Sequence, residues 1–178
     1  MLLKIVLGIL VVAATATTAD WALYTFGCHG TVAGVIDGAV LLTSVGGALG
    51  AVSGRLLRGL PIGTLAGIGG ALAYYALVAA FGERAYDAAI PAAWVITWLL
   101  MALLEGRWIS PTPRSWLAIA GRGTGAAVLS GIAFYLVLDR LWGEPPADGR
   151  NYALQFAAWA VAWAPGMLVL TLRPGRSA

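Results

Sequence analysis

Residues 30–70 read GTVAGVIDGAVLLTSVGGALGAVSGRLLRGLPIGTLAGIGG, with glycine recurring at intervals of four. The recurring glycines are Gly30, Gly34, Gly38, Gly46, Gly50, Gly54, Gly59, Gly63 and Gly67. In a water-soluble helix each of them would cost about 1 kcal/mol relative to alanine. In a bilayer, small residues four positions apart instead let two helix backbones approach closely. The pattern therefore predicts two transmembrane helices packed through a glycine zipper and joined by a short basic turn.

The composition places the whole chain in the same class. Of its 178 residues, 60% are hydrophobic and only 11% are charged, and the mean hydropathy is +0.84. Such values indicate an all-α, polytopic membrane protein, and the length suits a single transmembrane domain over residues 1–178. The formal net charge of +3 comes from basic residues in short loops. We therefore expect the lipid bilayer, and no nucleic acid, as the partner of this surface.

Six segments are long and apolar enough to cross a hydrocarbon core of about 30 Å. The expected spans are residues 2–19, 32–54, 61–81, 90–105, 116–138 and 152–172. The first begins with Met1-Leu2-Leu3-Lys4 and a short apolar run, as secretory signals do. We expect it to be retained as the first helix of the bundle.

The basic residues predict how this bundle is oriented. Those expected on one side are Lys4, Arg55, Arg58, Arg107, Arg114, Arg122, Arg173 and Arg176, and those on the other are Arg84, Arg140 and Arg150. The side richer in Lys and Arg normally faces the cytoplasm. The asymmetry therefore predicts a multi-pass protein of the cell (inner) membrane with both termini in the cytoplasm.

Asp37 is the one acidic residue that falls well inside an expected helix. An ionisable group at that depth is costly and marks a candidate functional site. Counting from the helix ends gives a similar depth for Tyr74, Tyr75, Trp98, Tyr135 and Trp159, with His29 and Cys28 at the mouth. We predict a small outward-open cavity in which Asp37 binds a cation, a proton or a hydrogen-bonding solute. The alternative is a structural network, in which a tyrosine or an arginine such as Arg140 pairs with Asp37.

Other chemistries find little support in the sequence. A single cysteine, Cys28, excludes an internal disulfide and a cysteine-built metal site, and a single histidine, His29, excludes bis-histidine haem ligation. General acid–base catalysis usually needs a second group within reach of the first, and the sequence offers no evident partner for Asp37. We therefore expect no cofactor, and an enzyme is the least favoured class.

The sequence leaves two functions open. The first is the handling of a small solute or ion, as a transporter, a channel or the substrate-binding subunit of a transporter. The second is a non-catalytic accessory or scaffold subunit of a larger membrane complex, with other membrane proteins docked on its glycine-lined faces. The first predicts that Asp37→Asn abolishes solute binding. The second predicts that a change such as Gly50→Leu on an outward-facing stripe releases a partner.

Overall fold

The computed structural model describes residues 1–82, 86–110, 114–143 and 148–172, and within these ranges the chain is helical, with no strand. The elements are α1 (Leu2–Phe26), α2 (Thr31–Val52), α3 (Leu56–Phe81), α4 (Tyr86–Leu104), the π-helical turn η2 (Glu105–Ile109), α5 (Trp116–Trp142) and α6 (Gly149–Thr171). Six helices in this part of the chain are long and apolar enough to cross a membrane. The prediction of an all-α chain with six such helices is confirmed.

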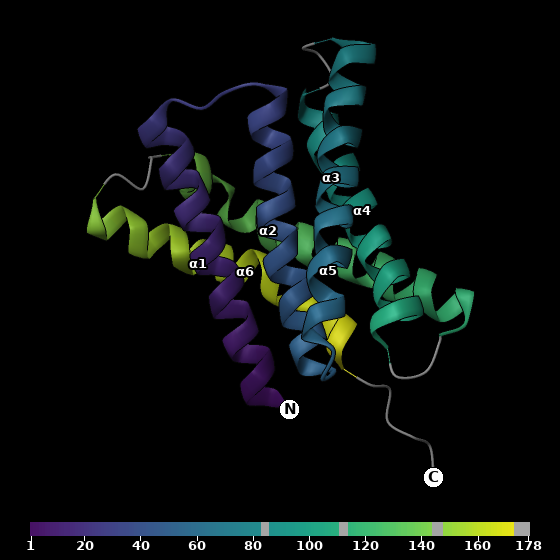
Figure 1. Cartoon of the computed structure of the whole chain (residues 1–178). Coiled ribbons are helices and arrows are strands. Elements are labelled where there is room, and N and C mark those ends of the chain that lie inside the picture. The colour runs from purple at the N-terminus through teal and green to yellow at the C-terminus, as the bar shows by residue number, and fades with distance from the viewer. Residues whose placement is uncertain (83–85, 111–113, 144–147, 173–178) are drawn as a thin grey trace.

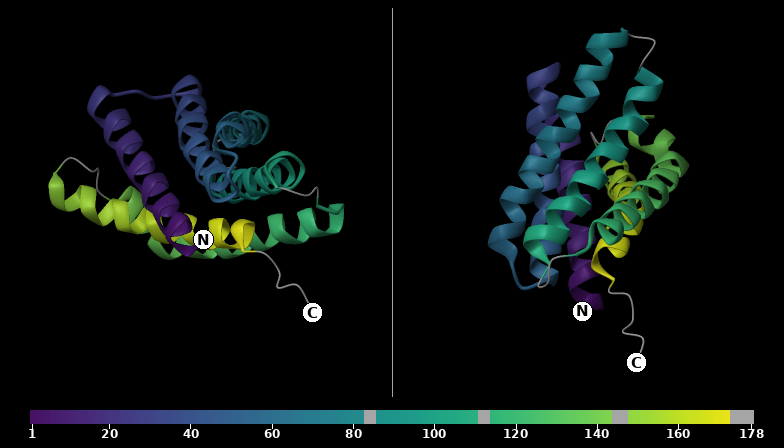
Figure 2. Two further views of the ribbon diagram at one scale, coloured as in Figure 1. Left: turned by 60° about the horizontal axis from the view of Figure 1, so that its bottom comes forward. Right: turned by 90° about the vertical axis from the view of Figure 1, so that its right-hand side faces the viewer.

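The helices form an upright group and an oblique pair (Figure 1). Helices α1 to α4 run up and down beside one another, and the α5–α6 hairpin crosses behind them, as both views of Figure 2 also show. Extensive contacts join α2 to α3 and α5 to α6, and α1 packs on both α2 and α6. The N-terminus and the end of α6 lie at the same end of the molecule, which we call the lower end after Figure 1.

The α2–α3 pair has the most extensive contact in the bundle, and its backbones touch at glycines. A Cβ atom added to Gly46 would overlap the carbonyl oxygen of Gly59, and one added to Gly63 would overlap that of Leu42. The hydroxyl groups of Thr43 and Thr64 form a 2.6 Å hydrogen bond across the same contact. Because nothing larger than hydrogen fits between the backbones, these glycines set the distance between the helices.

Three glycines of the recurring series have other positions than those expected from the sequence. Gly30 and Gly54 lie just beyond the two ends of α2 with φ values of 90° and 70°, and an added Cβ would contact nothing. Gly30 precedes the first turn of α2 and Gly54 follows its last turn, and both positions favour glycine because φ is positive there. Gly50, expected on an outward-facing stripe, is buried against the start of α3.

Helix α1 runs to Phe26 and does not end at residue 19. Gly27 closes it in the left-handed conformation, with φ 60°, and the N–H of Cys28 bonds to the carbonyl of Leu23 at 3.0 Å. The apolar run is interrupted at Asp20, which is why hydropathy alone places the boundary too early. As a result Asp20, which follows directly after the first expected span, lies inside a membrane-length helix.

The lower end is tied together by polar contacts. Glu105 is only 3% exposed and accepts two hydrogen bonds of 3.2 Å from Arg114, one from Nε and one from Nη2. Arg55, in the α2–α3 turn, donates a 2.8 Å bond to the carbonyl of Ser110.

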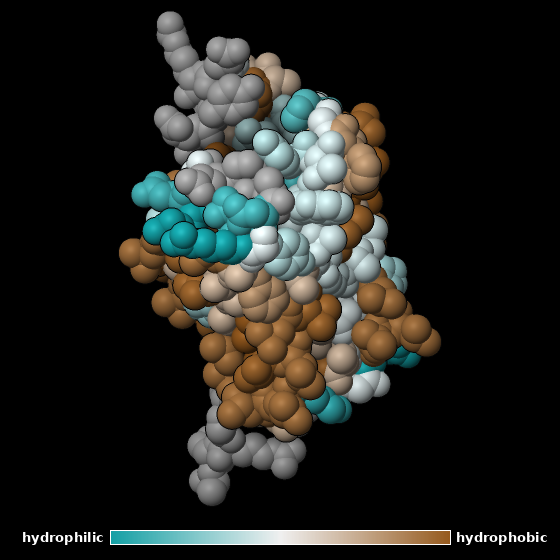
Figure 3. All heavy atoms as spheres, turned by 90° about the vertical axis from the view of Figure 1, so that its left-hand side faces the viewer, coloured by the Kyte–Doolittle hydropathy of each residue, from teal (hydrophilic) through white to brown (hydrophobic). Residues whose placement is uncertain are grey.

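Figure 3 shows the face that carries α1: a continuous hydrophobic surface covers its lower part, and hydrophilic residues gather over the start of α6.

Candidate functional site

A cavity of about 360 Å³ lies among α2, α3, α4, α5 and α6, and we call it the central cavity. Its polar and aromatic lining comprises Asp37, Tyr74, Tyr75, Trp94, Thr97, Phe134, Trp159 and Trp163. The remaining lining residues are small or aliphatic, among them Gly34, Gly38, Gly67 and Gly70. The volume lies within the range of about 300–1,000 Å³ typical of small-molecule sites.

Asp37 lies partly buried between this cavity and a second hollow. The second hollow is an apolar groove of about 570 Å³ between α1 and α2, and Asp37, Cys28 and His29 belong to its lining. Within the described ranges no hydrogen bond or ion pair reaches the Asp37 carboxyl group. The ion pair in these ranges joins Glu105 to Arg114 and does not involve Asp37. A carboxyl group inside a membrane-length helix thus has no protein partner in the described structure.

The Tyr75 side chain lines the central cavity in a position that requires glycine at residue 34. Its hydroxyl donates a 3.3 Å hydrogen bond to the carbonyl of Gly30. Its ring lies against Gly34, where an added Cβ would overlap the phenol. Tyr74 meets Tyr75 edge to face, with ring centroids 5.0 Å apart and planes at 83°. Gly34 therefore gives the Tyr75 side chain room at the side of the cavity where Asp37 lies.

The opposite wall is made of stacked aromatic rings from three helices. Trp94 of α4 lies 4.8 Å from Phe134 of α5 and 4.9 Å from Trp163 of α6, measured between centroids. Trp159, one turn before Trp163, stacks on it at 6.3 Å. Trp98 is fully buried behind this wall, 5.4 Å from Trp163. Three of these indoles, from Trp94, Trp159 and Trp163, and the phenyl ring of Phe134 give the cavity an aromatic side.

Asp20 supports this wall from α1. The Nε1–H of Trp159 donates a 2.7 Å hydrogen bond to a carboxyl oxygen of Asp20. Close by, the hydroxyl groups of Thr18 and Tyr152 are joined at 2.8 Å, so α1 and α6 share two polar contacts. Asp20 itself lies within α1, a helix of membrane-spanning length. The expectation that Asp37 is alone among acidic residues inside the helices is therefore wrong.

The residues that sequence reasoning selected lie in four different places. Asp37, Tyr74, Tyr75 and Trp159 line the central cavity together. Trp98 lies one layer behind, and Tyr135 lies on the outer side of α5, 48% exposed, with its ring against Phe134. His29 is exposed and lines the α1–α2 groove, not the central cavity.

Sequence reasoning missed Asp20, Trp94 and Trp163, which complete the site. Trp94 and Trp163 each lie four residues from a tryptophan that the depth count did select, Trp98 and Trp159. Residues four apart share one helix face, so Trp94 lies on the same face as Trp98, and Trp163 on the same face as Trp159. This spacing was the sequence signal by which Trp94 and Trp163 could have been found.

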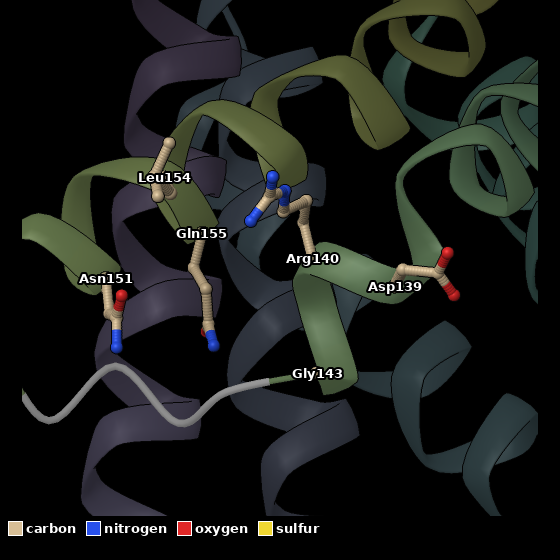
Figure 4. A pocket seen from close by; sticks show the side chains of 6 residues that line it. All are labelled: Asp139, Arg140, Gly143, Asn151, Leu154 and Gln155. Carbon is tan, nitrogen blue, oxygen red and sulfur yellow. The ribbon is translucent and has the colours of Figure 1, made fainter.

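A smaller pocket of about 170 Å³ lies between the end of α5 and the start of α6. Figure 4 shows Arg140 pointing toward α6 beside Leu154 and Gln155, while Asp139 points away. Arg140 belongs to this pocket and makes no ion pair with Asp37. The pairing of Asp37 with Arg140, considered from the sequence, is not present.

The described residues contain no group of three or more His, Cys, Asp or Glu side chains that could hold a metal ion.

Comparison with known proteins gives no relative: no protein-family model, no curated protein and no solved structure matches the chain significantly. The function of this chain must therefore be inferred from the geometry of the central cavity.

Proposed function

We propose that this chain is an integral membrane protein that handles a small solute or ion in the central cavity, as a transporter, a channel or the substrate-binding subunit of a transporter. The observation that carries the proposal is the Asp37 carboxyl group, which lies on a cavity of ligand size with no protein partner in the described ranges. A partly buried carboxylate without a partner inside a membrane-length helix is costly, so such a group points to a role in binding a ligand or a proton.

The basic residues support an orientation for this activity. In the described ranges Lys4, Arg55, Arg58, Arg107, Arg114 and Arg122 belong to segments near the lower end, and Arg140 and Arg150 to segments near the α5–α6 connection. By the positive-inside rule the lower end faces the cytoplasm of a cell (inner) membrane. The α1–α2 connection, with His29, then faces outward, and solute reaches Asp37 from that side.

The glycine contacts supply a frame for the cavity. Gly46, Gly59 and Gly63 hold α2 and α3 at backbone contact, and Asp37 and Tyr75 extend from these two helices on the cavity side. In lipid, close packing of this kind takes over the role that hydrophobic burial has in water. A glycine zipper therefore fixes the separation of the charged and phenolic parts of the wall.

A ligand screen by thermal shift tests the proposal. Wild type, Asp37→Asn and the control Asp139→Asn are purified in mild detergent and heated with cationic, anionic and neutral small solutes. Asp139 is exposed and points away from its own pocket, so its replacement removes the same charge without touching the central cavity. We expect a solute that raises the midpoint of wild type and of Asp139→Asn, but not of Asp37→Asn. Equal shifts in all three proteins would contradict the proposal.

One observation favours the second candidate, an accessory subunit. Leu117, Gly121, Thr124 and Val128 lie on one exposed face of α5, and an added Cβ at Gly121 would contact nothing. This face suits close packing of another membrane helix. Purification from native membranes with identification of partners by mass spectrometry tests it. A stoichiometric partner that Gly121→Leu releases, together with no solute-dependent shift, would favour the accessory subunit.

A further inference from the structure

We infer that the ligand of the central cavity is a substituted ammonium ion, a small organic cation whose nitrogen carries apolar groups. This inference rests on the proposed function and names its substrate class. The charge of the cavity, the chemistry of its wall and its size each support this ligand.

The charge of the lining is one-sided. Asp37 contributes a carboxyl group, and none of the residues that line the cavity is Lys, Arg or His. A cation in the cavity would meet an opposite charge that no side chain in the described ranges neutralises, whereas an anion would be repelled.

The wall favours an organic cation over a metal ion. Calcium and magnesium need six or more oxygen ligands, and the cavity offers the Asp37 carboxyl group and a few hydroxyls amid aromatic rings. Trp94, Trp159 and Trp163 line the cavity beside Phe134. Indole and phenyl faces attract alkylated ammonium groups through cation–π interactions, and their apolar surface accepts the alkyl substituents.

The size of the cavity leads to the same ligand class. A volume of about 360 Å³ greatly exceeds the space of a dehydrated inorganic ion and suits a small organic molecule. With Asp37 on α2 and the aromatic wall on α4, α5 and α6, a compact cation contacts the carboxylate on one side and the rings on the other.

Asp20 acts as a positioning residue for this wall. It does not line the cavity, but its carboxyl group holds the Trp159 indole through the 2.7 Å bond to Nε1. Hydrogen-bond donation to an acidic group also polarises the indole, because the bond shifts electron density toward the ring. The bond therefore fixes the position of the Trp159 indole in the cavity wall.

Choline and its uncharged isostere 3,3-dimethylbutan-1-ol separate recognition of charge from recognition of shape. Intrinsic tryptophan fluorescence of the full chain in detergent reports binding, because three indoles line the cavity. We expect saturable binding of choline by wild type and by Asp139→Asn, and binding weaker by about tenfold or more for the isostere. Asp37→Asn should weaken choline binding by a similar factor and leave binding of the isostere unchanged.

Two results with wild type alone would overturn the inference. One is equal affinity of wild type for choline and the isostere, and the other is no saturable response to choline by a folded wild-type protein. Both comparisons use wild type alone and stay decisive if Asp37→Asn does not fold. A neutral or anionic solute that binds in an Asp37-dependent way in the thermal-shift screen would contradict the inference that the ligand is a cation. It would leave the proposed function, the handling of a small solute or ion, standing. No response to any solute would overturn both.

Discussion

Trp159 and Asp20 join the last helix to the first through a 2.7 Å hydrogen bond between the indole Nε1 and a carboxyl oxygen. Trp159 at the same time lines the central cavity, where Asp37 lies with no protein partner in the described ranges. The two acidic residues thus have different roles. Asp20 is committed to a tryptophan, and Asp37 is left for a ligand.

Trp159→Phe should destabilise the protein by about 1–3 kcal/mol, because it leaves the Asp20 carboxyl group without its donor. Trp21→Phe is the matched control, since Trp21 is 38% exposed and no hydrogen bond involves its indole in the described structure. Thermal unfolding in detergent measures both. Equal loss in the two variants would show that the bond contributes nothing.

Gly63→Ala should separate α2 from α3, because the new methyl group would overlap the carbonyl of Leu42. Forced overpacking of this kind costs about 1–3 kcal/mol. Gly121→Ala, on an exposed face of α5 with no atom near the new Cβ, should be neutral or stabilising by up to about 1 kcal/mol. The midpoints of thermal unfolding distinguish them, and similar midpoints would contradict backbone contact between α2 and α3.

Gly34→Ala should impair ligand binding more than stability. The new methyl group would meet the far end of the Tyr75 side chain, which can swing away while the helices stay in place. Tyr75→Phe is the companion variant, because it removes only the hydroxyl that bonds to Gly30. We expect affinity for the best solute to fall several-fold in Gly34→Ala, by more than in Tyr75→Phe. Unchanged affinity in Gly34→Ala would remove Tyr75 from the binding wall.

Glu105→Gln should destabilise the lower end by about 2–4 kcal/mol, because it leaves Arg114 without its buried counter-charge. The double variant Glu105→Met with Arg114→Met should recover much of this loss, since replacement of both partners leaves no unpaired charge. A double-mutant cycle by thermal unfolding, completed with the single variants Glu105→Met and Arg114→Met, measures the difference. Additive losses would mean that the two side chains do not depend on each other.

Helix content and the central acidic residue could be predicted from the sequence because both follow from short-range patterns. Apolar runs gave the six helices, and depth counting brought Asp37, Tyr74, Tyr75 and Trp159 to one level, where all four line one cavity. Periodicity and the position of Asp37 on α2 were sufficient for that part of the site.

The positions of Trp94 and Asp20 in the site depended on where the helices begin and end, and hydropathy places helix ends poorly. A count from residue 90 selected Trp98, but α4 begins at Tyr86, and the same count from there gives Trp94, which lines the cavity. Asp20 lies just outside the expected span of residues 2–19 because the Gly27 cap further along the chain was not recognised. Tyr135 was one position from Phe134, about 100° around the helix, and so faces outward.

Equilibrium dialysis of the best-binding solute against wild type, Asp37→Asn and Ala93→Trp tests the central claim most directly. Ala93 lines the central cavity on α4, so a tryptophan there fills the space without changing the charge. We predict a single solute bound per wild-type chain, and binding lost in Ala93→Trp as well as in Asp37→Asn, with all three proteins folded. Undiminished binding in the two variants would contradict a site in the central cavity.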